Sequence, residues 1–169
     1  MTEQPPKVLV VATSRKTRGG ITAVVAALEQ QPLWKTFSCR WIETQIDRNV
    51  AWKLFYLIRS FLQFLWWIPR CQLVHFHTVP GNSVWVHLPY FLVSRLFGRK
   101  IILHLHVSNQ LKTAVNSKPL NYLLRHSDRI LVLSKNAAEV LRTLYHVQTP
   151  VEVVYNACRD LSRRSEVQK

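Results

Sequence analysis

The sequence predicts an α/β protein whose doubly wound, mostly parallel sheet carries helices on both faces. Short apolar runs rich in β-branched residues alternate along the chain with segments in which apolar residues recur at helical spacing. Of the 169 residues, 48% are hydrophobic and 19% are charged, which favours a folded domain over a disordered chain. Strands that alternate with helices in this way are joined by crossovers, and crossovers produce parallel pairing.

Strands are predicted at short apolar runs bounded by polar or turn-forming residues. Their ranges are 7–12, 37–44, 72–78, 100–107, 129–134 and 151–156. The first run is apolar nearly throughout, which is typical of a strand buried on both faces. The second alternates only weakly between apolar and polar residues.

Helices are predicted between these strands, where the apolar spacing is helical. Their ranges are 21–30, 52–68, 84–97, 120–125 and 135–145. Pro32 and Pro69 are expected to end the first two helices, and Gly98 the third. Pro89 lies inside the third range, so that helix is expected to begin later or to kink there. Residues 108–119 are expected to form a longer loop.

These elements predict one domain over residues 1–157, followed by a polar linker or tail at 158–169. The N-terminus lacks the cationic start and apolar core of a secretory signal. Cys39, Cys71 and Cys158 lie far apart without a CxxC pair. This usage favours reduced thiols and a cytoplasmic location.

The most apolar segment, residues 54–69, is short for a bilayer span and is interrupted by Arg59 and Gln63. We expect an amphipathic or buried helix there. Trp66 and Trp67 could dock this helix on the inner face of a membrane, because indole rings favour the membrane interface. The alternative is that the helix simply packs on the sheet.

The chain is strongly basic, with 23 Lys and Arg against 9 Asp and Glu and a net charge of +14. This excess predicts an anionic partner: a nucleotide, a nucleic acid or an anionic lipid. Nucleic acid is not expected as a partner, because no known binding module is present and the aromatic residues do not interleave with a basic strand face.

Three cations and two adjacent glycines separate the first strand from the first helix, in the stretch "TSRKTRGGIT" at 13–22. Glycines let backbone amides approach an anion, and the following helix N-terminus offers a favourable dipole. Arg18, Gly19 and Gly20 are therefore candidate ligand-binding residues. The alternative is that the glycines only shape the turn. The loop is neither a P-loop nor a GxGxxG motif.

Two His-x-His pairs occur near the ends of the third and fourth strands, His75 with His77 and His104 with His106. On a strand, residues i and i+2 face the same side, so each pair could hold a metal ion. We expect no metal, because Asp and Glu are scarce and no CxxC is present; zinc is the alternative. His75 and His104 are expected to be hydrogen-bonded core residues. His77 and His106, nearer the loops, are the better ligand candidates.

Several segments together resemble the N-terminal half of a family 4 glycosyltransferase with the GT-B fold, in the order in which that family has them. They are "GGITAVV", "LVHFHT" with "PGNSVWV" after it, "KIILHLHVS", "SDRILVLSK" and "VEVVYNAC". The resemblance covers about residues 7–158 and implies a Rossmann-like acceptor-side domain.

The resemblance implies transfer of a sugar from a nucleotide-sugar donor to a glycan or lipid-linked acceptor, without a cofactor. His106 corresponds to the active-site histidine of the family and is the candidate catalytic residue. The candidate substrate-binding residues are Arg18, Gly19, Gly20, His77, Asn82, Ser134, Lys135 and Asn156. Asn156 is followed by Ala157 where the family usually has glycine, which puts the usual turn in question.

The donor-binding domain that the resemblance implies is absent from the sequence. We therefore expect a half-enzyme that is inactive alone and needs a second domain or a partner subunit. The alternative is a non-catalytic anion-binding or regulatory module with the same fold. A metal-dependent hydrolase that uses the histidine pairs is a third interpretation, ranked last.

Overall fold

The computed structural model describes residues 6–106 and 109–155, and in this part of the chain six strands form one parallel sheet. The strand order is β2-β1-β3-β4-β5-β6. The strand bounds are Val8–Ala12 (β1), Arg40–Glu43 (β2), Leu73–Thr78 (β3), Lys100–Leu105 (β4), Arg129–Val132 (β5) and Val151–Val153 (β6). Every neighbouring pair is parallel, so the predicted α/β fold class is confirmed.

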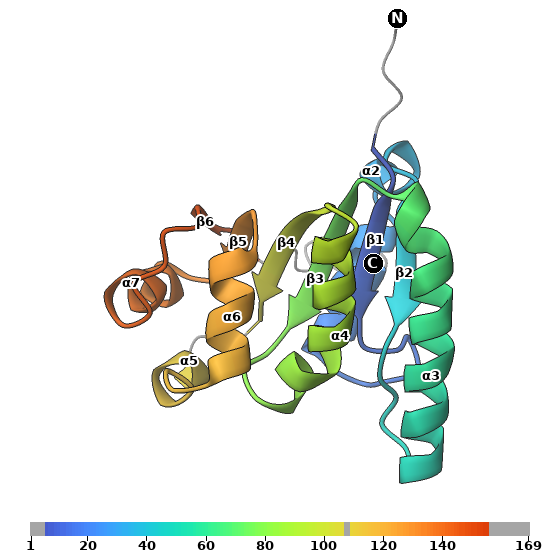
Figure 1. Cartoon of the computed structure of the whole chain (residues 1–169), viewed down its shortest axis with the longest axis horizontal. Helices are drawn as coiled ribbons and strands as arrows, with labels where there is room; N and C mark the ends of the chain where they lie inside the picture. The colour runs from blue at the N-terminus through green and yellow to red at the C-terminus, as the bar shows by residue number, and fades with distance from the viewer. Residues whose placement is uncertain (1–5, 107–108, 156–169) are drawn as a thin grey trace, which may run out of the picture.

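The direction of winding reverses between β1 and β3 (Figure 1). The chain runs outward from β1 to β2 on one side, then returns past β1 and adds β3 to β6 on the other side. Helices on opposite faces diverge at such a switch point, which leaves a crevice at the carboxyl ends of the strands. This edge is where a ligand site is expected.

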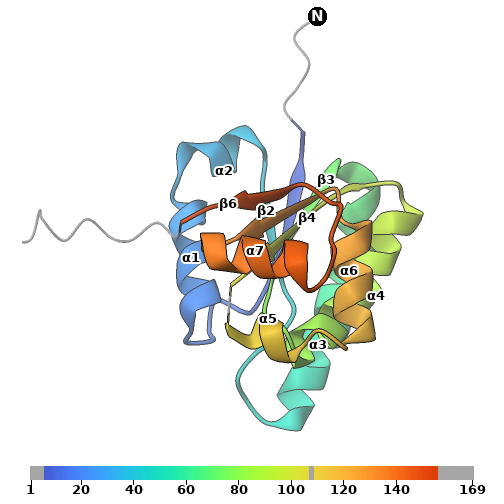
Figure 2. The ribbon, with the colours of Figure 1, turned by 90° about the vertical axis from the view of Figure 1, so that its left-hand side faces the viewer.

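Helices cover both faces, as predicted (Figures 1 and 2). The bounds are Gly20–Glu29 (α1), Pro32–Thr36 (α2), Val50–Trp67 (α3), Asn82–Leu96 (α4), Asn109–Thr113 (α5), Lys118–His126 (α6) and Lys135–Thr143 (α7), with a 3-10 turn at Ile68–Arg70 (η1). Helices α3, α4 and α6 lie on one face, and α1 and α2 lie on the other (Figure 2). Helix α7 packs beside β5 and β6.

Local signals explain where these helices begin. The Asn49 side chain accepts a hydrogen bond from the backbone nitrogen of Trp52 and caps α3. Ser117 caps α6 in the same way. Pro32 does more than end α1, because it begins the short helix α2, where the missing amide proton costs nothing. Pro89 lies within α4, which nevertheless runs from Asn82 to Leu96.

The larger of two apolar cores lies between the sheet and the helices α3, α4 and α6. Tyr90 of α4 is fully buried there, with Phe61 and Phe64 of α3 packed edge-on against its ring. Its hydroxyl lies 2.7 Å from the Ser60 hydroxyl, which satisfies both groups. The smaller core, around Val10 and Trp41, lies on the α1 face.

The structure departs from the predicted elements mainly in the segment at 108–119. This segment contains the helix α5, although it was expected to be a loop. Leu111 of α5 is fully buried, so tertiary packing favours a helical turn that local propensity does not specify. Among the described residues Cys39 and Cys71 are free thiols. No helix in the described ranges has both the length and the apolarity needed to cross a membrane.

Candidate functional site

The basic loop between β1 and α1, residues 13–19, is anchored to the end of β2. The backbone nitrogen of Ser14 donates to the Gln45 carbonyl at 2.6 Å, and the Ser14 hydroxyl donates to the Glu43 carboxylate at 2.6 Å. The Thr22 hydroxyl, on α1, donates to the Ser14 carbonyl and lies 3.0 Å from the Thr13 hydroxyl. The loop is therefore fixed at both ends.

Arg15 is an internal partner within this loop. Its guanidinium pairs with Glu29 at 2.6 Å and with Glu43 at 2.9 Å, and it stacks over the Trp41 ring. These paired charges line a hollow of about 370 Å³ beside β2. Lys16 and Arg18 are exposed and form no ion pair among the residues described here. The loop's uncompensated positive charge therefore lies on these two residues.

Gly19 and Gly20 begin α1, and the backbone needs neither of them to be glycine. Gly19 has an extended conformation, with φ 170° and ψ 166°, which any residue adopts. Gly20 also lies outside the positive-φ region. A Cβ atom built on either residue would meet no heavy atom within 4 Å. The interpretation that the glycines only shape the turn therefore has no support in the backbone geometry, and the space in front of them is open.

A cavity of about 630 Å³ lies between this loop, the segment after β2 and the first turns of α3 and α4. Its polar wall includes Thr13 and Thr17 of the basic loop and Asn82 of α4. Its apolar wall is formed by Ile46, Val50, Leu54, Leu57 and Val86. Among the residues singled out from the sequence as site residues, Asn82 lines this cavity.

The buried pair Thr44 and His87 supports the floor of this region. The Thr44 hydroxyl donates to the Ala12 carbonyl at 3.1 Å, so its lone pair accepts from His87 Nε2 at 3.2 Å. This contact joins the end of β1 and the residue after β2 to α4. Burial lowers the pKa of His87 to about 4. The ring is therefore neutral at physiological pH.

Four histidines lie on the opposite face from this cavity: His75 and His77 of β3, His104 of β4, and His106 directly after β4. Phe76 packs on Phe91 of α4, so its neighbours His75 and His77 point to the α1 side. His77 is completely buried, and its Nδ1 lies 2.8 Å from Nε2 of the half-exposed His106. Burial lowers the pKa of His106 to about 3. His106 therefore presents a neutral ring at the sheet edge.

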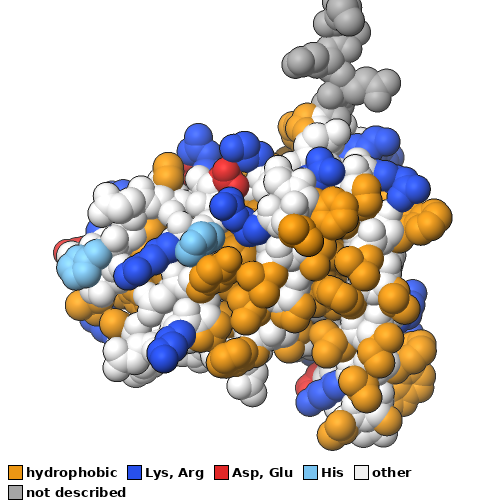
Figure 3. Space-filling model, viewed as in Figure 1, with side chains coloured by type: hydrophobic (Ala, Val, Ile, Leu, Met, Phe, Trp, Pro, Cys, Tyr) orange, Lys and Arg blue, Asp and Glu red, His pale blue; other side chains and the backbone are white. Residues whose placement is uncertain are grey.

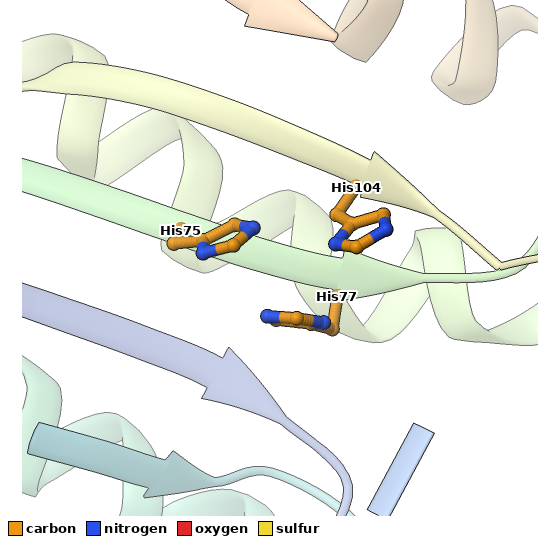
Figure 4. Close-up of side chains that lie close together, drawn as sticks. All are labelled: His75, His77 and His104. Atoms are coloured by element: carbon orange, nitrogen blue, oxygen red, sulfur yellow. The ribbon is translucent and has the colours of Figure 1, made fainter. Parts of the chain in front are cut away.

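The inner histidines contradict the expectation that they would be hydrogen-bonded core residues. Nε2 of His75 and both ring nitrogens of His104 are buried without a hydrogen-bond partner. Figure 4 shows these rings beside that of His77. The expectation was wrong because strand alternation predicts which face His75 and His104 occupy. It does not predict which hydrogen-bonding groups lie near them on that face.

The remaining predicted site residues lie at the far end of the same edge or outside the described residues. The Ser134 hydroxyl accepts from the backbone nitrogen of Ala137 at 3.2 Å and caps α7. Lys135 is exposed on the first turn of that helix. Asn156 and the predicted tail at 158–169 lie outside the described residues. The structure thus divides the described candidates between the start of α1, the cavity, the histidine face and the start of α7.

Sequence reasoning missed the residues that follow β2. Gln45, Asp47 and Lys53 line the cavity, and Thr44 supports it. The polar run after the second strand, residues 44–49, was the signal in the sequence that could have found them. The weak alternation of that strand left its end poorly defined.

The comparisons with known proteins now identify the class. The family model for Glycosyltransferase Family 4 matches residues 8–159, and the chain belongs to this family. No curated protein matches the sequence. Among solved structures, sucrose-phosphate synthase from Thermosynechococcus elongatus is similar over 96% of this chain and 94% of the matched chain, with 16% sequence identity and a TM-score of 0.49. That likeness is too distant to say anything about substrates.

Proposed function

We propose that this glycosyltransferase domain is the acceptor-binding half of its enzyme and that its acceptor is linked to a lipid in an anionic membrane. The donor in this proposal is a nucleotide-sugar, and a second domain or partner subunit holds most of it. The domain would then lie on the cytoplasmic face of the membrane as a peripheral protein.

The observation that carries the proposal is the continuity of the cavity with an exposed apolar strip on α3. We define the α3 strip as Val50, Leu54, Ile58 and Leu62, which repeat every four residues along one side of the helix. They are 81%, 56%, 54% and 62% exposed. Val50 and Leu54 also line the cavity. A lipid chain along the strip would therefore lead its headgroup into the cavity.

Helix α4 extends this apolar surface. Trp85, Leu92 and Leu96 are exposed on it, the last by 83%. Figure 3 shows hydrophobic side chains gathered over α3 and α4 on this face. An exposed apolar area of this extent marks an interaction surface.

The charges around this surface match an anionic membrane. Neither α3 nor α4 contains an acidic residue, whereas α3 carries Lys53 and Arg59 and is flanked by Arg48 and Arg70. Arg70 and Arg48 stack over Trp66 and Trp52, which would place cation and indole together at the headgroup level. Apolar side chains would enter the acyl region while these cations contact lipid phosphates.

The sheet edge beyond the cavity offers what a sugar-phosphate group needs. Lys16 and Arg18 supply positive charge, and the amides at Gly19 and Gly20 begin a helix in open space. The neutral, half-exposed His106 could hydrogen-bond a sugar hydroxyl. In this proposal the headgroup occupies the cavity and the donor phosphate approaches the start of α1.

Vesicle co-sedimentation tests the membrane part of the proposal. We expect the protein to bind vesicles of phosphatidylglycerol and phosphatidylcholine at low salt, and to bind pure phosphatidylcholine vesicles far more weakly. Ile58→Glu with Leu62→Glu should weaken binding at least about tenfold, because each buried aliphatic side chain contributes about 1.5–3 kcal/mol.

Leu144→Glu is the matched control, since Leu144 is 46% exposed just beyond α7, away from α3 and α4. It should bind vesicles like the unmodified protein. Equal binding by the double variant would exclude docking through the α3 strip, and no preference for anionic vesicles would exclude an anionic membrane as the partner.

A further inference from the structure

We propose that His75, His77 and His104 form a binding site for a transition-metal dication such as Zn²⁺ on the α1 face of the sheet. This departs from the sequence-based expectation of no metal. It is independent of the proposed membrane docking, because the three residues lie on the face opposite α3 and α4.

The sheet register brings the three side chains together. His75 and His77 occupy alternate positions of β3 and therefore share a face. Parallel pairing of β3 with β4 sets His104 directly opposite His77. One ring nitrogen of each residue lies within 4.8 Å of the other two. Figure 4 shows the three rings grouped between the two strands.

Each of the three rings has at least one buried nitrogen without a hydrogen-bond partner. Nε2 of His75, Nε2 of His77 and both nitrogens of His104 are buried without a hydrogen bond. A buried polar atom left unpaired costs about 1–3 kcal/mol, so three such groups in one place call for a ligand. All three rings lie on the face of the sheet that α1 covers, and α1 provides no hydrogen-bond partner for these nitrogens.

The donor set selects the kind of metal. Imidazole nitrogens suit Zn²⁺, Cu²⁺ and Ni²⁺, whereas Mg²⁺ and Ca²⁺ prefer oxygen ligands. Three histidines leave a fourth position open to water or another ligand. Zn²⁺ with bonds of about 2.1 Å requires nitrogens about 3.4 Å apart, so the rings would move inward by about 1 Å. Burial keeps the rings neutral, which is the form that binds metals.

The surroundings supply both support and access. His77 Nδ1 lies 2.8 Å from His106 Nε2, so a metal on His77 Nε2 places the shared proton on Nδ1. Nε2 of His106 then accepts the hydrogen bond from His77 Nδ1–H, and the His106 ring carries its own proton on Nδ1. His75 lines an apolar cavity of about 290 Å³ that gives an entry path from that side. The metal would thereby orient the candidate catalytic residue His106.

Metal binding is tested directly, on untagged protein freed of metal with a chelator. We expect isothermal titration with Zn²⁺ at pH 7.5 to give one site per chain, and Co²⁺ to give the visible absorption of tetrahedral coordination. His75→Ala and His104→Phe should each weaken binding at least about 100-fold, since a ligand is lost. His104→Phe retains the ring volume and guards against simple unfolding.

His126→Ala is the control, because His126 is exposed on α6 and lies outside the cluster. It should bind one Zn²⁺ with unchanged affinity. The proposal is overturned if the unmodified protein takes up no stoichiometric metal, or if a folded His75→Ala, His104→Phe double variant binds as tightly as the control. Circular dichroism of each variant establishes that it is folded.

Discussion

His87 shows how a single buried side chain ties the sheet edge together. Its Nε2 donates to Thr44, which in turn donates to the carbonyl of Ala12, so one chain of hydrogen bonds crosses three elements. The ring is 1% exposed and burial lowers its pKa to about 4. As the pH falls, His87 therefore becomes protonated at a higher pH in the unfolded chain than in the folded protein.

This difference predicts a pH dependence of stability. The folded pKa lies below the ordinary value of 6.5, so the contribution of His87 is complete above pH 6.5 and is lost as the pH falls towards 4. Each pH unit in this window should cost about 1.4 kcal/mol. His87→Gln keeps a donor for Thr44 but cannot titrate.

Urea unfolding of both proteins at pH 7.5 and pH 4.5 gives the comparison. The unmodified protein should lose about 2–3 kcal/mol more than His87→Gln over this range. The difference between the two proteins cancels the contribution of the other histidines. If the unmodified protein and His87→Gln lost the same free energy of unfolding, the pKa of His87 would be the same in the folded and unfolded states.

At the scale of an element, the first turn of α1 combines an open surface with two glycines that its backbone does not require. Glycine at a helical position costs about 0.5–1 kcal/mol relative to alanine. Helix α1 has neither a side-chain cap nor an acidic residue in its first turn. Stability alone would favour another residue there, which is consistent with a ligand that approaches the backbone.

Gly20→Ala distinguishes a glycine that shapes the turn from a glycine that leaves room for a ligand at the backbone. Its Cβ would meet no heavy atom within 4 Å, so we expect the free energy of unfolding to rise by about 0.5–1 kcal/mol. If the donor phosphate of the proposed function approaches this turn, the same variant should raise the KM for the nucleotide-sugar. A lower free energy of unfolding in the variant would mean that the turn requires glycine. An unchanged KM would exclude close approach of the donor phosphate to Gly20.

At the scale of the whole molecule, the sheet divides the proposed functions between its two faces. The cavity and the α3 strip belong to one face, and the histidine cluster belongs to the other. His106 stands at the shared edge, half-exposed, where β4 ends. Groups from both faces can therefore act on one substrate only at this edge, which is the usual place for a ligand in a doubly wound sheet.

Glycosyl transfer tests the position of His106. We expect His106→Ala to lower kcat/KM by at least about tenfold, the effect of about 1.4 kcal/mol of lost transition-state stabilisation. Membranes from cells that carry the variant provide the assay, with His126→Ala as the exposed control. Full activity in a folded His106→Ala protein would remove His106 from the catalytic site.

Local sequence patterns were sufficient to predict much of the fold. β-branched runs located the strands, and the alternation within β3 correctly predicted that His75 and His77 share a face. Helix α5 was missed because the burial of Leu111 stabilises it. Asn82 was a candidate through the resemblance to the glycosyltransferase family, but only folding brought it beside Thr13 and Thr17.

Local patterns in the sequence fix where strands and helices follow one another, which face each strand residue occupies and the basic character of the loop after β1. These properties follow from periodicity and composition, which act over a few neighbouring residues. Contacts between distant segments are needed to set His104 opposite His77 and to neutralise Arg15 with Glu29 and Glu43. Register and ion pairing between distant segments depend on how the intervening helices pack, and no local pattern encodes that packing.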